Sequence, residues 1–203
     1  MQSGTIMLTN IALLWLAALP LMGSPGPATL STAAVGAAFG FRRGVPYMAG
    51  IIAGTAAVLL LIATGVTGAL LVFPGLETAI RVLAAAYICY LAWRIATAPP
   101  LGQPDPAQTA PGAASGFLLA IANPKAFAAI GAVYAQNTVA PDDLALDTAL
   151  KIAALTAVIV ASNTVWLYSG TALASVLRAP RASRAVNIAF AVLLVGSVGF
   201  ALL

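Results

Sequence analysis

The sequence contains no histidine and a single cysteine, and only 7% of its 203 residues are charged. Without histidine there is no imidazole base, no Ser-His-Asp triad and no histidine metal site. Cys89 has no partner for a disulfide or a thiolate metal site. The Gly-rich loop ending in Lys-Ser or Lys-Thr that cradles nucleotide phosphates is also missing. We therefore expect no metal, no cofactor, no catalytic residues and no enzymatic activity.

Charge is scarce because the chain is apolar: 62% of its residues are hydrophobic, and the mean hydropathy is +1.02. A soluble domain has roughly 25% charged and roughly 45–50% apolar residues. A spanning helix needs about 20 residues to cross a ~30 Å hydrocarbon core. The composition predicts one all-α membrane domain over residues 1–203 in contact with a lipid bilayer. The net charge of +4 then reports topology rather than binding of nucleic acid.

The apolar segments predict a polytopic bundle of six spans, of which the first and the fourth are interrupted by proline. Their expected bounds are about Met7–Phe39, Val45–Phe73, Leu76–Ala98, Ser115–Asn137, Leu150–Val176 and Ala185–Leu203. An acidic loop with Asp142, Asp143 and Asp147 should precede the fifth span. Five spans are the alternative, because the first segment is the weakest.

The basic residues predict the orientation in the membrane. Six of the nine Lys and Arg residues fall in the odd-numbered loops, at positions 42, 43, 94, 178, 181 and 184. Cytoplasmic loops carry an excess of Lys and Arg. We therefore expect the odd loops to be cytoplasmic and both termini to be periplasmic, in a bacterial inner membrane.

The two interrupted spans suggest an internal repeat. Pro27 and Pro124 lie 97 positions apart, and a Pro-rich stretch over residues 99–114 separates the halves. Each half, over about residues 5–98 and 115–203, would hold three spans, and an odd number of spans inverts the second half. Inverted repeats with broken helices at matching positions indicate a transporter site.

The first interruption is Gly23-Ser24-Pro25-Gly26-Pro27. Each proline removes an N–H and clashes with the preceding helical turn, and in lipid such a break survives only inside protein or beside a water-filled cavity. The carbonyls before Pro25 suit an ammonium group, and the N-terminus of the resuming helix suits a carboxylate. We predict that this segment binds substrate, and a plain proline kink is the alternative.

The second interruption is Asn123-Pro124-Lys125. Pro124 should free the carbonyl of Ala120, and Asn123 should cap the half-helix that follows. Lys125 lies near the middle of its span, where a charge costs at least roughly 2.5–3.5 kcal/mol. We predict that these three residues bind substrate, with Lys125 holding a carboxylate or relaying protons. Snorkelling of Lys125 to the interface is the alternative.

Other intramembrane polar side chains give weaker signals. Tyr87, Asn163 and Thr164 are candidate pore-lining residues, and hydrogen bonds between helices are the alternative for Asn163 and Thr164. Gly50 and Gly54 favour close packing of helices. No Asp or Glu lies in the middle of a span, and a path for cations would normally offer carboxylates. The expected solute is therefore neutral or zwitterionic.

Several of these motifs together resemble the LysE/RhtB family of amino-acid exporters. The resemblance covers about residues 23–134 and is carried by Gly23–Pro27, Gly40-Phe41-Arg42-Arg43-Gly44, Gly50, Gly54, Ala86-Tyr87, Tyr90-Leu91, Trp93 and Asn123–Lys125. It implies export of an amino acid from the bacterial cytoplasm, driven by the proton gradient. Ala28 stands where the family often has Asn or Asp, and Tyr134–Asn137 replaces its usual Pro-Gln-Phe pattern.

Two other classes of function compete with an exporter. An intramembrane enzyme would need a nucleophile, for which a Ser24/Lys125 dyad is the sole candidate. A membrane assembly subunit would not need two broken helices or a lysine in mid-span. A homodimer is compatible with all three classes.

Overall fold

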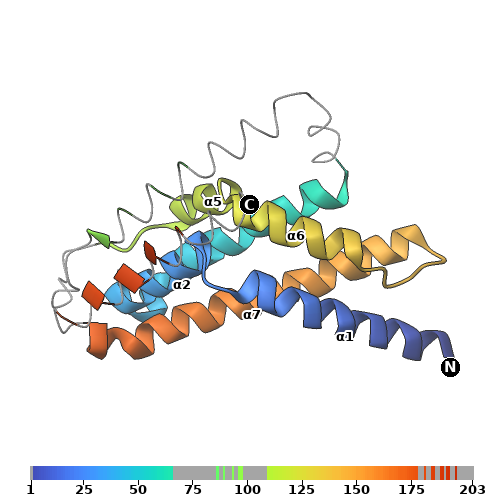
Figure 1. Ribbon diagram of the computed structural model, residues 1–203, viewed down its shortest axis with the longest axis horizontal. Coiled ribbons are helices and arrows are strands. Elements are labelled where there is room, and N and C mark those ends of the chain that lie inside the picture. Colours follow the sequence, from blue (N-terminus) through green and yellow to red (C-terminus); the bar gives the residue numbers. More distant parts are fainter. Residues whose placement is uncertain are drawn as a thin grey trace.

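The structure, a computed structural model, describes residues 2–65 and 109–177 and scattered positions between 86 and 97 and between 181 and 195. The two long stretches form helices, with short turns between them (Figure 1). The helices are α1 (Gln2–Gly23), α2 (Pro27–Ala63), α5 (Ala113–Ile121), α6 (Pro124–Gln136) and α7 (Leu144–Leu177). Tyr87, most of the Pro-rich stretch and most of the expected third and sixth spans lie outside the described residues.

Three described helices are long and apolar enough to cross a membrane. The spans are Thr5–Gly23, Pro27–Ala63 and Leu144–Ala174. The pair α5 and α6 passes the same test together and is bent by 62°. An all-helical membrane architecture is therefore confirmed, and the broken fourth span agrees with its expected bounds to within two residues. The six-span layout and the repeat remain predictions.

Helix α2 reverses direction at Gly40, where the backbone leaves helical geometry with φ 78° and ψ 168°. Val35 and Tyr47, on either side of the turn, belong to one buried cluster, and a Cβ at Gly44 would lie 3.4 Å from Cγ1 of Val35. Glycine adopts such a positive φ without steric strain. The loop expected over Gly40–Gly44 is thus too long, since a single non-helical residue makes the turn.

Helix α1 and the first half of α2 run side by side with α7, in the same direction (Figure 1). Their partners along α7 follow in sequence order: Trp15 bonds the carbonyl of Ala154, Trp166 bonds that of Gly23, and Thr171 bonds that of Gly36. The second half of α2, α5 and α6 run the opposite way (Figure 1). The interrupted segments around Pro27 and Pro124 therefore cross the bundle in opposite directions.

Glycines bring these helices into backbone contact. A Cβ at Gly170 would overlap the carbonyl oxygen of Ala33, and one at Gly54 would lie 2.7 Å from the carbonyl oxygen of Phe117. Gly50 packs on the carbonyl of Ala113 in the same way. Small residues allow this close approach in membrane helices. The packing role expected for Gly50 and Gly54 is confirmed.

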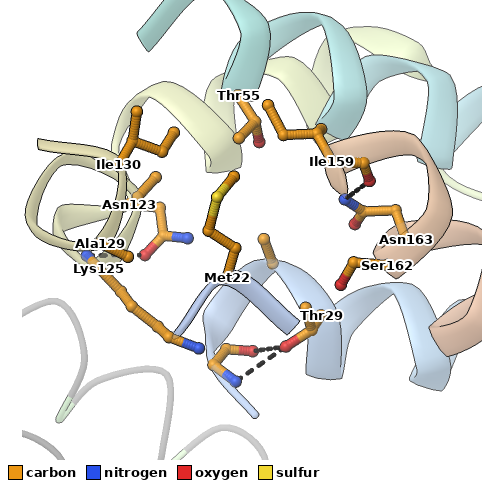
Figure 2. Close-up of a pocket in the computed structure, with 13 residues that line it drawn as sticks. Met22, Thr29, Thr55, Asn123, Lys125, Ala129, Ile130, Ile159, Ser162 and Asn163 are labelled. Atoms are coloured by element: carbon orange, nitrogen blue, oxygen red, sulfur yellow. Dashed lines mark hydrogen bonds between the residues drawn. The ribbon is translucent and has the colours of Figure 1, made fainter. Parts of the chain in front are cut away.

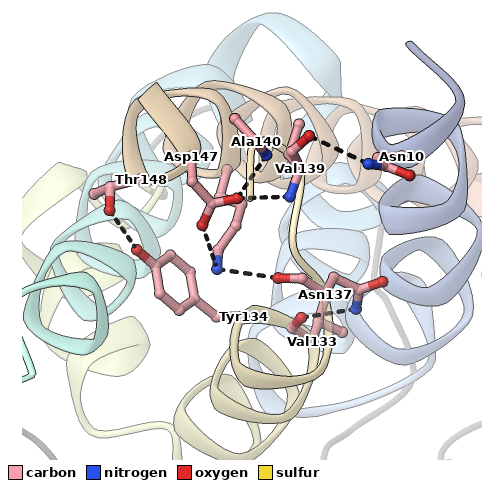
Figure 3. Close-up of polar contacts among 9 residues, drawn as sticks. Asn10, Val133, Tyr134, Asn137, Val139, Ala140, Asp147 and Thr148 are labelled. Carbon is pink, nitrogen blue, oxygen red and sulfur yellow. Dashed lines mark hydrogen bonds and ion pairs between the residues drawn. The ribbon is translucent and has the colours of Figure 1, made fainter. Parts of the chain in front are cut away.

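A buried ion pair fixes the turn between α6 and α7 (Figure 3). Lys151 Nζ lies 3.0 Å from Asp147 Oδ2 and donates to the carbonyl of Asn137 at 3.0 Å. Asp147 Oδ1 accepts the N–H groups of Val139 and Ala140. The expectation that Asp147 lies in a loop is wrong: α7 begins at Leu144, six residues earlier than expected. The pair stabilises the early start because it satisfies both charges within one helical turn.

The main core lies where α1, α2, α6 and α7 meet. Its fully buried members include Leu14, Leu59, Ile130, Leu155 and Ile159. Large apolar side chains of α1 and α7 are instead exposed, among them Leu8, Leu16, Val165 and Tyr168. Outward-facing apolar side chains of this size are expected where a helix faces lipid.

Candidate functional site

The break between α1 and α2 is built from local interactions. Gly26 is the N-cap of α2, with extended backbone at φ −172° and ψ 178°, and Pro27 occupies the first helical position. Proline suits that position because its missing N–H would be unpaired there in any case. The hydroxyl of Thr29 accepts the N–H of Gly26 at 2.9 Å and lies 3.3 Å from the carbonyl oxygen of Ser24. The break is therefore an ordered segment.

Side chains from distant helices hold the carbonyls of this break. The indole of Trp166 donates to the carbonyl of Gly23 at 2.9 Å. The ammonium of Lys125 donates to the carbonyl of Ser24 at 2.5 Å and to that of Pro25 at 3.1 Å. An ammonium carries three N–H donors, so these two bonds leave one donor for a further acceptor. The structure thus brings the two interruptions predicted from the sequence into direct contact.

The second break positions Lys125. Asn123 caps α6 by accepting the backbone N–H of Lys125 at 3.2 Å, as expected, and Pro124 takes the first helical position. The expectation of a free carbonyl at Ala120 is wrong, because it accepts the N–H of Asn123 at 3.2 Å. A tighter last turn of this kind often satisfies the end of a helix.

A cavity of about 40 Å³ lies between the two breaks (Figure 2). Its walls come from α1, the start and the second half of α2, the first half of α6 and the middle of α7. The lining residues are Met22, Gly26, Ala28, Thr29, Thr55, Asn123, Lys125, Ala126, Ala129, Ile130, Ile159, Ser162 and Asn163. The N-terminal ends of α2 and α6 both reach the cavity, and each contributes a partial positive charge.

The wall formed by α7 carries unpaired polar atoms. Ser162 Oγ and Asn163 Oδ1 are buried, and no described group hydrogen-bonds to them. Asn163 is fixed by its amide, which donates to the carbonyl of Ile159 at 2.9 Å (Figure 2). A buried polar atom without a partner is unfavourable, so these two atoms indicate a place where water or a solute binds. Thr164 is not in the lining, and its hydroxyl bonds the carbonyl of Val160 in its own helix.

Lys125 is the only charged side chain among the cavity-lining residues. The hydroxyl of Ser24 donates to the carbonyl of Leu21, and Lys125 contacts the carbonyl of Ser24 rather than this hydroxyl. The geometry therefore does not form the Ser24/Lys125 dyad. In the described part of the chain no cluster of His, Cys, Asp or Glu could hold a metal ion.

Four residues of the site with hydrogen-bonding side chains were not predicted from the sequence: Thr29, Thr55, Ser162 and Trp166. Thr29 follows the N-cap by three residues, which is a recognisable capping pattern. Ser162 precedes Asn163, so the pair could have been considered together. Thr55 and Trp166 have no such signal, because their roles depend on how the helices pack.

One of three comparisons with known proteins identifies a family. A family model described as LysE type translocator matches residues 19–203, a range that includes both breaks and every lining residue of the cavity. The search of curated proteins gave no match, and the search of solved structures gave none either.

Proposed function

We propose, since the chain belongs to the LysE type translocator family, that it exports amino acids or similar small zwitterionic solutes across the inner membrane of a bacterium. Neutral amino acids are the proposed cargo, and the proton gradient is the proposed driving force. The observation that carries this proposal is the contact of the two helix breaks at Lys125, beside a cavity with unpaired polar walls.

The cavity offers complementary groups for both charges of a zwitterion. The carbonyls of Ser24 and Pro25 suit an ammonium group, as Lys125 itself illustrates. The N-terminal ends of α2 and α6 favour a carboxylate. Ser162 and Asn163 can bond to either group or to a polar side chain. No carboxylate lines the cavity in the described residues, which disfavours a second cationic group on the solute.

The size of the cavity supports a closed conformation. A water molecule needs about 10–15 Å³ of such space, whereas ligand sites measure roughly 300–1,000 Å³. A cavity of about 40 Å³ admits a few water molecules. Loading of a solute therefore requires the helices around it to move apart, and alternating access would provide this movement on each side of the membrane in turn.

The proposal is tested with purified protein in proteoliposomes. Vesicles loaded with unlabelled L-leucine or L-threonine should accumulate the labelled amino acid by counterflow, and protein-free vesicles should not. Excess unlabelled neutral amino acids should compete with the label more strongly than lysine or arginine does. Folded protein that gives no counterflow with a panel of amino acids would contradict an exporter. Saturable transport of lysine alone would contradict a neutral cargo.

A further inference from the structure

The ammonium of Lys125 occupies the position that a solute's ammonium would need. Its two bonds go to the carbonyls of Ser24 and Pro25, which lie in the break; the Ser24 carbonyl also lies 3.3 Å from the hydroxyl of Thr29. Two ammonium groups cannot share these oxygens, because like charges a few ångströms apart repel strongly in a poorly polar environment. The lysine is therefore an internal competitor for one end of the proposed site.

We propose that the Lys125 ammonium and the ammonium of the exported solute alternate on the carbonyls of Ser24 and Pro25, so that one proton enters for each solute that leaves. This inference rests on the proposed export function and names its coupling residue. When the site is open to the cytoplasm, Lys125 gives one proton from Nζ to water and the neutral amine leaves the carbonyls. The solute then binds there through its own ammonium.

The return step uses the same residue. Once the site has opened to the outside and the solute has left, Nζ takes one proton from external water and bonds to the carbonyls again. The site then closes to the outside and reopens to the cytoplasm, with the Lys125 ammonium in place of the solute's ammonium. Each cycle moves one solute outward and one proton inward. No covalent bond other than the N–H bond of Lys125 forms or breaks.

The surroundings of Lys125 suit this exchange. Thr29 and Thr55 on α2, Asn123 on α6, and Ser162 and Asn163 on α7 are uncharged, and none of them titrates in the physiological range. The portion of α1 that lines the cavity contributes only Met22. Among the described lining residues, Lys125 is therefore the group that gains or loses a proton.

Three ionisable groups of α6 and α7 are separated from this ammonium along their helices. Tyr134, Asp147 and Lys151 interact with one another near the turn between α6 and α7, more than two helical turns along the chain from Lys125 and from Ser162.

Space around the ammonium is provided by Gly26. A Cβ at this position would lie 2.7 Å from Cδ and 3.0 Å from Nζ of Lys125. Glycine therefore lets the long lysine stem lie against the break, and the flexible stem can also swing away when the amine is neutral.

Two substitutions of Lys125 give opposite predictions. Lys125→Met leaves the carbonyls permanently open to the solute, so counterflow of labelled L-leucine should persist while uptake driven by a proton gradient is lost. Lys125→Arg puts a group on the site that stays protonated, so counterflow and driven uptake should both fall at least tenfold. A merely structural lysine would make the two variants behave alike. Gel filtration of the purified variants checks that they are folded.

The wild-type protein provides a test that needs no variant. One proton should compete with one solute. In the pH range where Lys125 is mostly protonated, the apparent Kd for L-leucine should therefore rise by up to about tenfold for each unit by which the pH falls. Proton influx measured with an internal dye should equal one per leucine exported.

Several results would overturn the inference. They are driven uptake that survives in Lys125→Met, loss of counterflow in a folded Lys125→Met variant, or binding of L-leucine to the wild type that does not change with pH. The second result would mean that Lys125 holds the solute itself. Absence of counterflow for every amino acid in the folded wild type would instead remove the export function, and this inference with it.

Discussion

Gly26 is the residue that decides how closely Lys125 approaches the break. Gly26→Ala introduces a Cβ 2.7 Å from Cδ of Lys125, and at φ −172° alanine adopts the same backbone without strain. We expect the ammonium to lose its hold on the carbonyls. Since a hydrogen bond to a charged group contributes about 1.5–3 kcal/mol, proton-driven transport in proteoliposomes should fall about tenfold or more.

The matched control for this variant lies on the helix that carries Lys125. A Cβ at Gly131 meets no atom within 4 Å, so Gly131→Ala should transport at the wild-type rate. Equal rates in Gly26→Ala and Gly131→Ala would show that the position of the lysine does not matter for transport.

At the same scale, local chemistry explains which parts of the site the sequence could predict. Proline and glycine act on their own backbone, so both breaks and the cap at Asn123 were predictable from neighbouring residues. The bonds from Trp166 to Gly23 and from Lys125 to Ser24 join residues more than 100 positions apart. No local pattern specifies such pairs, because they depend on how the helices pack.

Among the elements, α2 and α7 make the most extensive contact in the described chain. Gly170→Ala would drive a Cβ into the carbonyl oxygen of Ala33, a backbone atom that cannot move without shifting its helix. Overpacking of this kind costs typically about 1–3 kcal/mol, so the variant should unfold at a lower temperature in detergent. The control is Gly112→Ala, whose Cβ meets nothing within 4 Å. Identical melting temperatures for the two variants would contradict this packing.

The bounds of two helical elements show what the sequence could and could not predict. Apolar runs bounded by proline predicted the bent fourth span well, because hydropathy and proline act locally. The start of α7 was placed too late, since Asp147 looked like a loop residue. Its charge is instead satisfied within the helix by Lys151 and by two backbone N–H groups of the preceding turn. A buried pair at a spacing of four residues can therefore lengthen a helix beyond its apolar run.

At the scale of the molecule, the charged residues at the two ends of the described helices differ in sign. Arg42 and Arg43 follow the turn at Gly40, near the end of α7, and both are exposed. Asp142 and Asp143 precede the start of α7 at the opposite end, which is also where α1 begins (Figure 1). If the basic end faces the cytoplasm, as the bias of Lys and Arg predicts, α1 begins on the opposite side of the membrane.

The corresponding prediction is that both termini are periplasmic. Alkaline phosphatase is active only outside the cytoplasm and green fluorescent protein folds well only within it, so fusions of each after Asn10 and after Leu203 report the side. We expect phosphatase activity and no fluorescence at both positions. Cytoplasmic signals from both would reverse the orientation, and with it the direction in which Lys125 would carry protons. A cytoplasmic signal from one terminus alone would require an odd number of spans, and two inverted three-helix halves could not then make up the chain.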